Sequence, residues 1–300
     1  MKKISKTRIR FTSVSAARWF MLMIVGSVIL FPILSLFAAS VKDVYGLVDP
    51  MVKWIPREMH FENFSKAFEA VGGASALVTS LLLYGTVMLC QLCSSLVIAY
   101  GFARYGFKGR NIIFALMIAT FFVPQQVVML PRYVLFSKYG MLGTVWTVVL
   151  PSLCGQGLRQ VLLILIFWQF MKTIPVSLEE AAMIDGATLP GIFFRIGVPL
   201  AAPGIVISSV LSFAWNWNDT FFANSYFNNK ITTMTISLSK IRNWYSSQSG
   251  NYASYGGGEK FHQGVEAAGA VLVILPLLIV YLLLQKKLIE SVDRAGITGE

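Results

Sequence analysis

Apolar residues gather in long runs along the chain, separated by shorter polar stretches. The runs cover residues 19–40, 75–100, 111–131, 144–170, 200–222 and 265–285. A helix of about 20 apolar residues is long enough to cross the hydrocarbon core of a bilayer. The pattern therefore predicts an all-α, polytopic membrane protein with six transmembrane helices.

The first apolar run is also compatible with a signal peptide, because basic residues precede it and small residues follow Phe37. A signal-peptide core is usually about 7–15 residues long, and this run is longer. We therefore expect the run to remain as the first span.

Composition supports the membrane assignment, because 56% of the residues are hydrophobic and only 13% are charged. The net charge of +11 is mostly explained by basic residues that flank the spans, above all in the acid-free stretch before residue 19. Basic flanks mark the cytoplasmic side, and six spans return the chain to that side. The expected parts are a cytoplasmic basic tail (1–18), a membrane domain (19–286) and a cytoplasmic C-terminal tail (287–300).

The residues that usually carry catalysis or bind metals form no recognisable group. Cys90 and Cys93 make a C-x-x-C pair inside the second apolar run, where helix packing is the simpler interpretation. His60 and His262 stand alone in outer loops, without a nucleophile or carboxylate at a suitable spacing. We predict no catalytic residue, no metal site and no cofactor in this chain.

The polar stretch between the fourth and fifth runs predicts a pair of short cytoplasmic helices. Ser177 and Glu180 have the spacing of a capping box, which would start a helix at about residue 178. Gly186 would end it, and Thr188 with Pro190 would begin a second helix that Pro199 closes.

This helix pair suits docking into a groove of another protein. Small residues on one side of the bend would allow a close backbone approach, and Met183, Ile184, Ile192 and Phe193 offer apolar anchors. The helix pattern alone is equally compatible with a connector that lies on the membrane surface.

The order of residues in this stretch resembles the cytoplasmic signature of permease subunits in binding-protein-dependent ABC importers. Glu180-Ala181-Ala182 is followed after three residues by Gly186, after nine more by Ile196, and then by Val198-Pro199, where the signature usually has Leu before Pro. The resemblance implies the membrane domain of a type I ABC importer, whose loop docks on an ATP-hydrolysing subunit. The residues expected to couple the two subunits are Glu179, Glu180, Ala181, Ala182, Asp185, Gly186, Ile196 and Pro199.

Further stretches resemble the carbohydrate-uptake branch of that family, in particular the second permease of maltose-type importers. They are "KWIPREMHFENFSKAF" (53–68), "AYGFARYGFKGR" (99–110), "MLPRYVLFSKYGMLGT" (129–144) and "WNWND" (215–219). The ending "QKKLIESVDRAGITGE" (285–300) is also similar, with Thr298 where Lys is common.

The chain has no G-x-x-x-x-G-K-[ST] sequence, so a partner must bind ATP and its Mg²⁺. A single signature per chain implies a second, related permease subunit, two ATP-binding subunits and an extracytoplasmic solute-binding protein. The expected location is the cytoplasmic (inner) membrane of a prokaryote.

Polar residues within the spans indicate where a substrate could pass, because such residues are costly in lipid. Gln156, Arg159 and Gln160 interrupt the fourth run, and Gly155 and Gly157 would loosen its helix. We expect the three polar side chains to line the passage, although Arg159 could instead face backbone carbonyls or the membrane edge.

A second polar group ends the fifth run. Asn216, Asn218 and Asp219 accompany Trp215 and Trp217, which could simply anchor the helix at the lipid boundary. Two amides and a carboxylate are unnecessary for anchoring, so we expect an outer gate.

The outer loop after the fifth run is rich in aromatic and small residues. Trp244, Tyr245, Tyr252 and Tyr255 could contact the binding protein or stack on sugar rings, or the loop could be a solvated linker.

The predicted function is import of a carbohydrate, an oligosaccharide with acidic sugars included, driven by ATP. The alternative cargo is a polyol or a glycerol-phosphate compound. An ion-driven secondary transporter would instead need inverted repeats and paired ionisable groups in the membrane.

Overall fold

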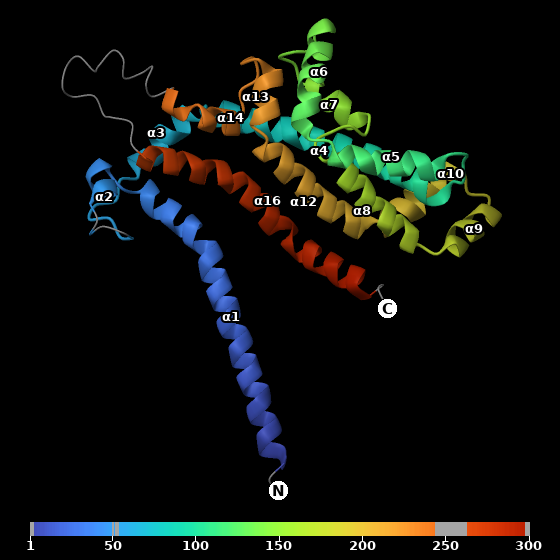
Figure 1. Ribbon diagram of the computed structural model, residues 1–300, viewed down its shortest axis with the longest axis horizontal. Coiled ribbons are helices and arrows are strands. Elements are labelled where there is room, and N and C mark those ends of the chain that lie inside the picture. Colours follow the sequence, from blue (N-terminus) through green and yellow to red (C-terminus); the bar gives the residue numbers. More distant parts are fainter. Residues whose placement is uncertain (1–2, 50, 52–53, 244–262, 298–300) are drawn as a thin grey trace. The chain divides into compact units, whose positions relative to one another are not determined.

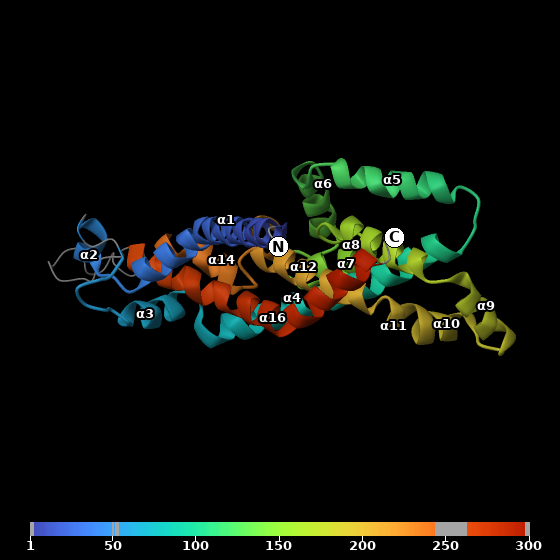
Figure 2. The same ribbon diagram turned by 90° about the horizontal axis from the view of Figure 1, so that it is seen from below.

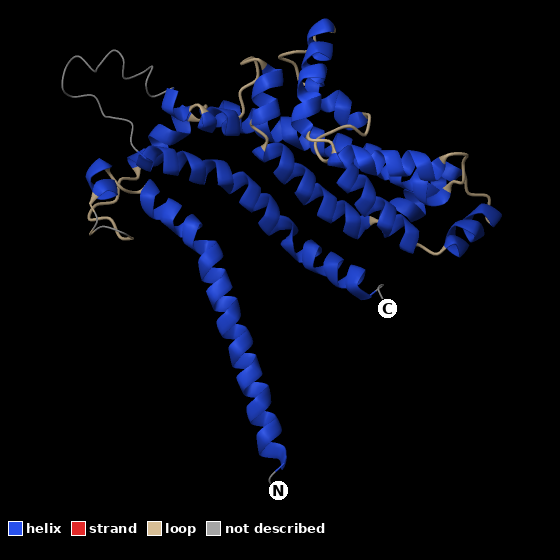
Figure 3. Ribbon diagram, viewed as in Figure 1, coloured by secondary structure: helices blue, strands red, loops and turns tan. Residues whose placement is uncertain are grey.

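Every regular element in the described part of the chain is a helix, as the all-α prediction requires (Figure 3). The computed structural model describes residues 3–49, 51, 54–243 and 263–297. These residues divide into two compact units. One comprises Met1–Ala70 with Ile241–Leu272, and the other Val71–Lys240 with Val273–Glu300.

The first unit contains the N-terminal helix and short helices that follow it (Figure 1). Its elements are α1 (Lys3–Ser40), α2 (Val44–Val48), α3 (Glu62–Ala70) and the beginning of α16 (Gln263–Ile297). Asn63 is buried and donates hydrogen bonds to the carbonyl oxygens of Ser40 and Lys42, at 3.0 and 2.9 Å. These bonds fasten α3 to the end of α1.

The second unit contains the helices that carry the predicted coupling and passage residues. Its elements are α4 (Gly73–Arg104), α5 (Arg110–Phe122), α6 (Gln125–Lys138), α7 (Trp146–Leu153), α8 (Gln160–Thr173), α9 (Val176–Ile184), α10 (Leu189–Ile192), the π-helical η1 (Phe193–Gly197), α11 (Val198–Leu200), α12 (Ala202–Asn218), α13 (Phe221–Phe227), α14 (Met234–Ser239) and the rest of α16.

Three of the helices are long and apolar enough to cross a membrane, namely Arg18–Ser40, Gly73–Arg104 and Gln263–Ile289. Up to six spans result if each sharply bent helix pair counts as one. The chain is therefore a multi-pass membrane protein. Large apolar side chains along α1 are exposed, as expected for a helix that faces lipid.

Two of the predicted spans are not continuous helices. The run 111–131 bends by 99° between α5 and α6, where Pro124 lacks the amide that a continuing helix needs (Figure 2). The run 144–170 is interrupted between α7 and α8 by residues 154–159.

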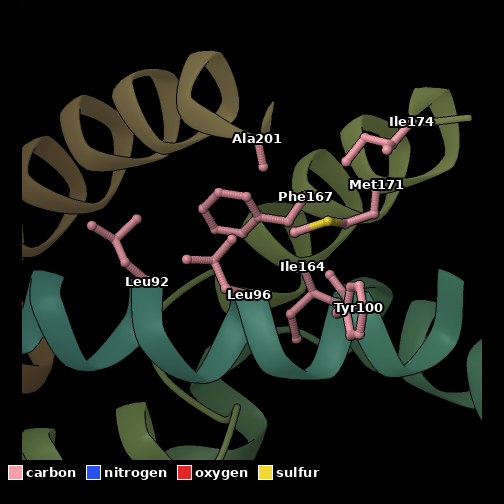
Figure 4. Close-up of a cluster of buried hydrophobic side chains, with 9 residues drawn as sticks. Leu92, Leu96, Tyr100, Ile164, Phe167, Met171, Ile174 and Ala201 are labelled. Atoms are coloured by element: carbon pink, nitrogen blue, oxygen red, sulfur yellow. The ribbon is translucent and has the colours of Figure 1, made fainter. Parts of the chain in front are cut away.

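The core of the second unit forms around α4, which packs against α7, α8 and α12. One buried cluster joins Leu92, Leu96 and Tyr100 of α4 to Ile164, Phe167 and Met171 of α8 (Figure 4). A second cluster surrounds Trp217 of α12, whose indole nitrogen donates a 3.1 Å hydrogen bond to the carbonyl oxygen of Val273. These contacts fix the helices that carry the polar residues described below.

Candidate coupling hairpin and polar passage

Residues 176–200 form a bent pair of short helices, which we call the coupling hairpin. Both views place α9 and α10 at one end of the second unit (Figures 1 and 2). The predicted capping box is wrong, because α9 begins at Val176 and makes no side-chain cap. Ser177 thus lies inside the first turn. Pro175 occupies the cap position, where its missing amide removes one of the donors that a helix start leaves free.

The helix α9 ends at Ile184, with Asp185 as its cap and Gly186 directly after it, which confirms the predicted stop near Gly186. Gly186 adopts φ +82°, the left-handed conformation that other L-residues rarely take. The amide of Ala187 bonds to the carbonyl oxygen of Ala182 at 2.9 Å, and the amide of Gly186 bonds to that of Met183 at 3.0 Å. This pair of bonds is a Schellman motif, which closes the helix and reverses the chain.

The second arm begins where predicted but continues further. Thr188 caps α10, with its hydroxyl accepting from the amide of Gly191 at 3.3 Å. Pro199 does not close the arm. The preceding π-helical turn bonds the Val198 amide to the Phe193 carbonyl, so Pro199 falls in the first turn of α11, where a missing amide is tolerated.

Only some of the predicted apolar anchors face outward. Ile184 is 87% exposed and Met183 is 49% exposed. Ile192 is buried and offers no surface to a partner, while Phe193 is half-buried and packs against Tyr100. Leu189 and Phe194 are exposed instead and extend the apolar surface of the hairpin.

The predicted coupling residues differ in exposure. Those that face solvent are Glu180, Ala181, Asp185, Gly186 and Pro199, while Ala182 and Ile196 are half-buried. Glu179 is buried, with its side chain only 6% exposed. The hairpin therefore presents one carboxylate of the Glu179-Glu180 pair outward and the other inward.

Glu179 faces Arg104, the last residue of α4. Arg104 Nε lies 2.7 Å from Glu179 Oε1, and the Arg104 side chain is 9% exposed. Neither atom has a hydrogen-bond partner of good geometry, so the contact is an ion pair held by charge. Sequence patterns missed Arg104, since a basic residue at the end of a span is explained by membrane topology alone.

The helix break at residues 154–159 confirms the effect predicted for the glycines. Gly155 has φ +76°, and Arg159, a residue with a β-carbon, has φ +51° at the start of α8. A β-carbon on Gly157 would meet the side chains of Gln91, Gln160 and Ser152 at less than van der Waals contact. The chain therefore leaves helical geometry and presses closely on its neighbours at this point.

The buried side chain of Gln160 makes hydrogen bonds across this helix break. It is 1% exposed, and its Oε1 accepts a 2.7 Å hydrogen bond from the amide of Gly157. Its Nε2 lies 2.6 Å from Ser94 Oγ and 2.9 Å from the carbonyl oxygen of Ser152. These bonds join α8 to α4 and to the end of α7.

Gln91 forms a second buried contact beside the first. Its Oε1 accepts from Ser212 Oγ at 2.5 Å and from Asn216 Nδ2 at 3.2 Å, while its Nε2 donates to the Leu158 carbonyl oxygen at 3.3 Å. Gln91 was not among the residues predicted from the sequence. Gln91 could have been found by the criterion that identified Gln156, because it too is an amide inside an apolar run.

An open recess lies next to these networks, with a volume of about 420 Å³ that includes space open to solvent. The polar residues that line it are Gln125, Arg132, Thr147, Ser152, Gln156, Asn216 and Asp219. Phe222 and Tyr226 add aromatic surface. Three of the predicted passage residues thus meet in one recess, together with Gln125 and Arg132, which were not predicted from the sequence.

The other predicted passage residues lie outside the recess lining. Gln160 is committed to the buried network, and exposed Asn218 donates to the carbonyl oxygen of Ala214 at 2.9 Å. The Arg159 guanidinium carbon lies 5.5 Å from the centre of the Trp215 ring, a cation–π distance. Trp217 is buried, so it does not anchor the helix at the lipid boundary.

The predicted contacts to a binding protein, Trp244, Tyr245, Tyr252 and Tyr255, lie outside the described residues. Within the described ranges, no three His, Cys, Asp or Glu side chains gather closely enough to hold a metal ion. The functional roles of the predicted site residues stay predictions.

Known proteins resemble the chain over most of its length. It is 30% identical over 283 residues to the arabinooligosaccharides transport system permease protein AraQ of Bacillus subtilis, covering 92% of this chain and 93% of the relative. It is 28% identical over 250 residues to the melibiose/raffinose/stachyose import permease protein MelC of the same organism, covering 82% and 84%.

A solved structure shows the same fold. The crystal structure of a bacterial ABC transporter involved in the import of the acidic polysaccharide alginate contains a chain that superposes with a TM-score of 0.71 at 21% identity, covering 92% of this chain and 96% of that one. Residues 94–294 match the family model of the binding-protein-dependent transport system inner membrane component. This match covers both the coupling hairpin and the polar recess, and the chain belongs to that family of ABC transporter permeases.

Proposed function

We propose that this chain is one of two permease subunits in an ATP-driven importer that carries an oligosaccharide across the cytoplasmic membrane. Membership of the permease family supports the transport role, and the names of the relatives support a carbohydrate cargo. The complete importer would add a related permease, two ATP-hydrolysing subunits and an extracytoplasmic binding protein.

The exposed coupling hairpin carries this proposal. Its outer surface combines apolar Met183, Ile184, Leu189 and Phe194 with the carboxylate of Glu180. An apolar surface of this kind, on two short helices joined by a tight turn, fits a groove on a partner protein. In the proposed importer, the ATP-hydrolysing subunit occupies this surface and passes its closing movement to the spans as a rigid-body displacement.

The recess suits a substrate rich in hydroxyl groups. Gln156 and Asn216 offer amides, Asp219 accepts hydrogen bonds, and Arg132 donates them. Aromatic surface from Tyr226 adds a face on which a sugar ring can pack. We therefore place the sugar pathway at this recess, with Arg159 close enough to attract acidic sugars as they pass.

Uptake into proteoliposomes tests the proposal. The chain is co-expressed with its partner subunits, reconstituted, and supplied with binding protein, internal ATP and radiolabelled neutral or acidic oligosaccharides, with a polyol as an alternative cargo. We expect uptake of an oligosaccharide only with ATP, and its loss in Gly186→Val, whose β-branched side chain disfavours the left-handed turn. Uptake driven by an ion gradient without ATP would overturn the proposal.

A further inference from the structure

A bend of 70° separates α8 from α9, and one side chain of α4 contacts both sides of it. Arg104 Nη2 donates a 2.8 Å hydrogen bond to the carbonyl oxygen of Ile174, just after α8 ends. The Nε atom of the same guanidinium lies 2.7 Å from the Glu179 carboxylate on α9. Because a guanidinium is rigid and planar, these two contacts fix the angle of the elbow.

Tyr100 reinforces this arrangement from one turn earlier on α4. Its hydroxyl donates to Glu179 Oε2 over a long 3.4 Å, and its ring centre lies 5.0 Å from that of Phe193 in an edge-to-face contact. Figure 4 shows Tyr100 on α4, with Met171 and Ile174 on the neighbouring end of α8. The end of α4 therefore touches both arms of the coupling hairpin.

The attachment of α9 through this elbow is unusual because it is polar. All residues of α9 are described, and Glu179 is the buried one among them, while Val176, Leu178, Met183 and Ile184 remain exposed. Burying a carboxylate and a guanidinium removes both from water, a cost that apolar packing would avoid. An ion pair supplies what apolar packing lacks, namely a fixed direction and distance between two groups.

We propose that Arg104 and Glu179 are a positioning pair that locks the elbow, so that movement of α9 displaces α8 and α4 together. Tyr100 supports the pair. Glu180, which faces outward, is left free to meet the ATP-hydrolysing partner. This inference rests on the proposed function, because it assigns a role in the coupling of ATP hydrolysis to transport.

The test compares Arg104→Lys and Glu179→Gln with wild type in the reconstituted complex. Lysine keeps the charge but replaces the rigid planar guanidinium with a single nitrogen on a flexible stem, and glutamine removes the ion pair while keeping the shape. We expect both complexes to hydrolyse ATP but to import about tenfold less sugar per ATP, a size typical of coupling between sites. Glu58→Gln, which changes an exposed carboxylate outside the hairpin, is the matched control.

A distance measurement on the same complexes is independent of transport. Spin labels on the exposed residues Gln169 of α8 and Ser177 of α9 report the elbow, in a background without the native cysteines. We expect one narrow distance distribution in wild type and in Glu58→Gln, and a broadened one in both elbow variants.

The two readouts separate the possible failures. Unbroadened distances in both variants would overturn the positioning pair, whether or not the complex transports. Broadened distances with an unchanged sugar-to-ATP ratio would also overturn it, because the elbow would then not govern coupling. A wild-type complex without ATP-dependent uptake would refute the proposed function instead, while the distances would still decide whether Arg104 and Glu179 set the elbow.

Discussion

Gln160 Nε2 lies 2.6 Å from the hydroxyl oxygen of Ser94, a hydrogen bond that ties the first residue of α8 to the middle of α4. The bond lies where the chain has just left helical geometry, after the left-handed Arg159. A broken helix inside a membrane exposes backbone groups that lipid cannot satisfy. The side chain of Gln160 satisfies one of them, the amide of Gly157, and thereby makes the break stable.

Replacement of Gln160 by leucine should destabilise the protein. The change leaves the Gly157 amide without its buried acceptor, and an unsatisfied buried group of this kind costs about 1–3 kcal/mol. The measurement is the thermal unfolding midpoint of the purified protein in detergent. Gln156→Leu, which changes an exposed amide four residues away, should leave the midpoint nearly unchanged. Equal midpoints for the two variants would contradict a structural role for the Gln160 network.

Gly157→Ala should also destabilise the protein, for a steric reason. The added methyl group would overlap the Gln91 side-chain amide and crowd Gln160 Oε1 and Ser152 Oγ. Overpacking of this kind costs about 1–3 kcal/mol. Gly85→Ala in α4 is the control, because its β-carbon meets no atom within 4 Å and alanine favours a helix. A Gly157→Ala protein as stable as the control would contradict this, because the neighbouring side chains would then have room for the added methyl group.

The sequence predicted the existence of this break but not its construction. Glycines and amides inside an apolar run indicate that a helix is loosened, because their backbone and side-chain preferences are local. The partners of Gln160 are Ser94 on α4 and Ser152 on α7, and only tertiary packing brings them together. Gln91 was missed for the same reason, since its contact with Ser212 joins residues 121 positions apart.

The turn at Gly186 allows a prediction that depends on backbone conformation alone. A β-carbon there would meet no atom within 4 Å, so only the φ of +82° opposes substitution. A β-branched residue pays about 1–2 kcal/mol or more in the left-handed region, while asparagine tolerates it better. We expect Gly186→Val to abolish import and Gly186→Asn to retain much of it.

The assay for Gly186 is ATP-dependent uptake, combined with co-purification of the ATP-hydrolysing subunits. Gly106→Val provides the control, because Gly106 also has open space around its β-carbon position but no positive φ. Similar losses for Val and Asn at position 186 would mean that a partner surface, and not the turn, excludes side chains there.

The sequence motif of the coupling hairpin predicted its local structure but not the orientation of its two glutamates. Its turn at Gly186 and its second start at Thr188 follow from local chemistry and are present in the structure. The inward turn of Glu179 does not follow, because two adjacent glutamates look alike in sequence. Their separation depends on Arg104, which lies 75 positions earlier and reaches α9 only through the packing of α4 against α8.

Asp219→Asn should change which sugars the importer prefers. Asp219 lines the recess, and its Oδ1 accepts a 3.2 Å hydrogen bond from the Phe222 amide. Asparagine can keep that bond while removing a negative charge, and the loss of one repulsion in a watery site is worth about 1 kcal/mol, or about fivefold. Uptake of an acidic oligosaccharide should therefore rise relative to a neutral one of equal length.

Competition between the two labelled sugars in proteoliposomes measures the ratio, with Asn224→Ala on the exposed side of α13 as control. An unchanged ratio would place the sugar pathway away from Asp219, and the recess would then be a structural gap between α6, α7 and α12.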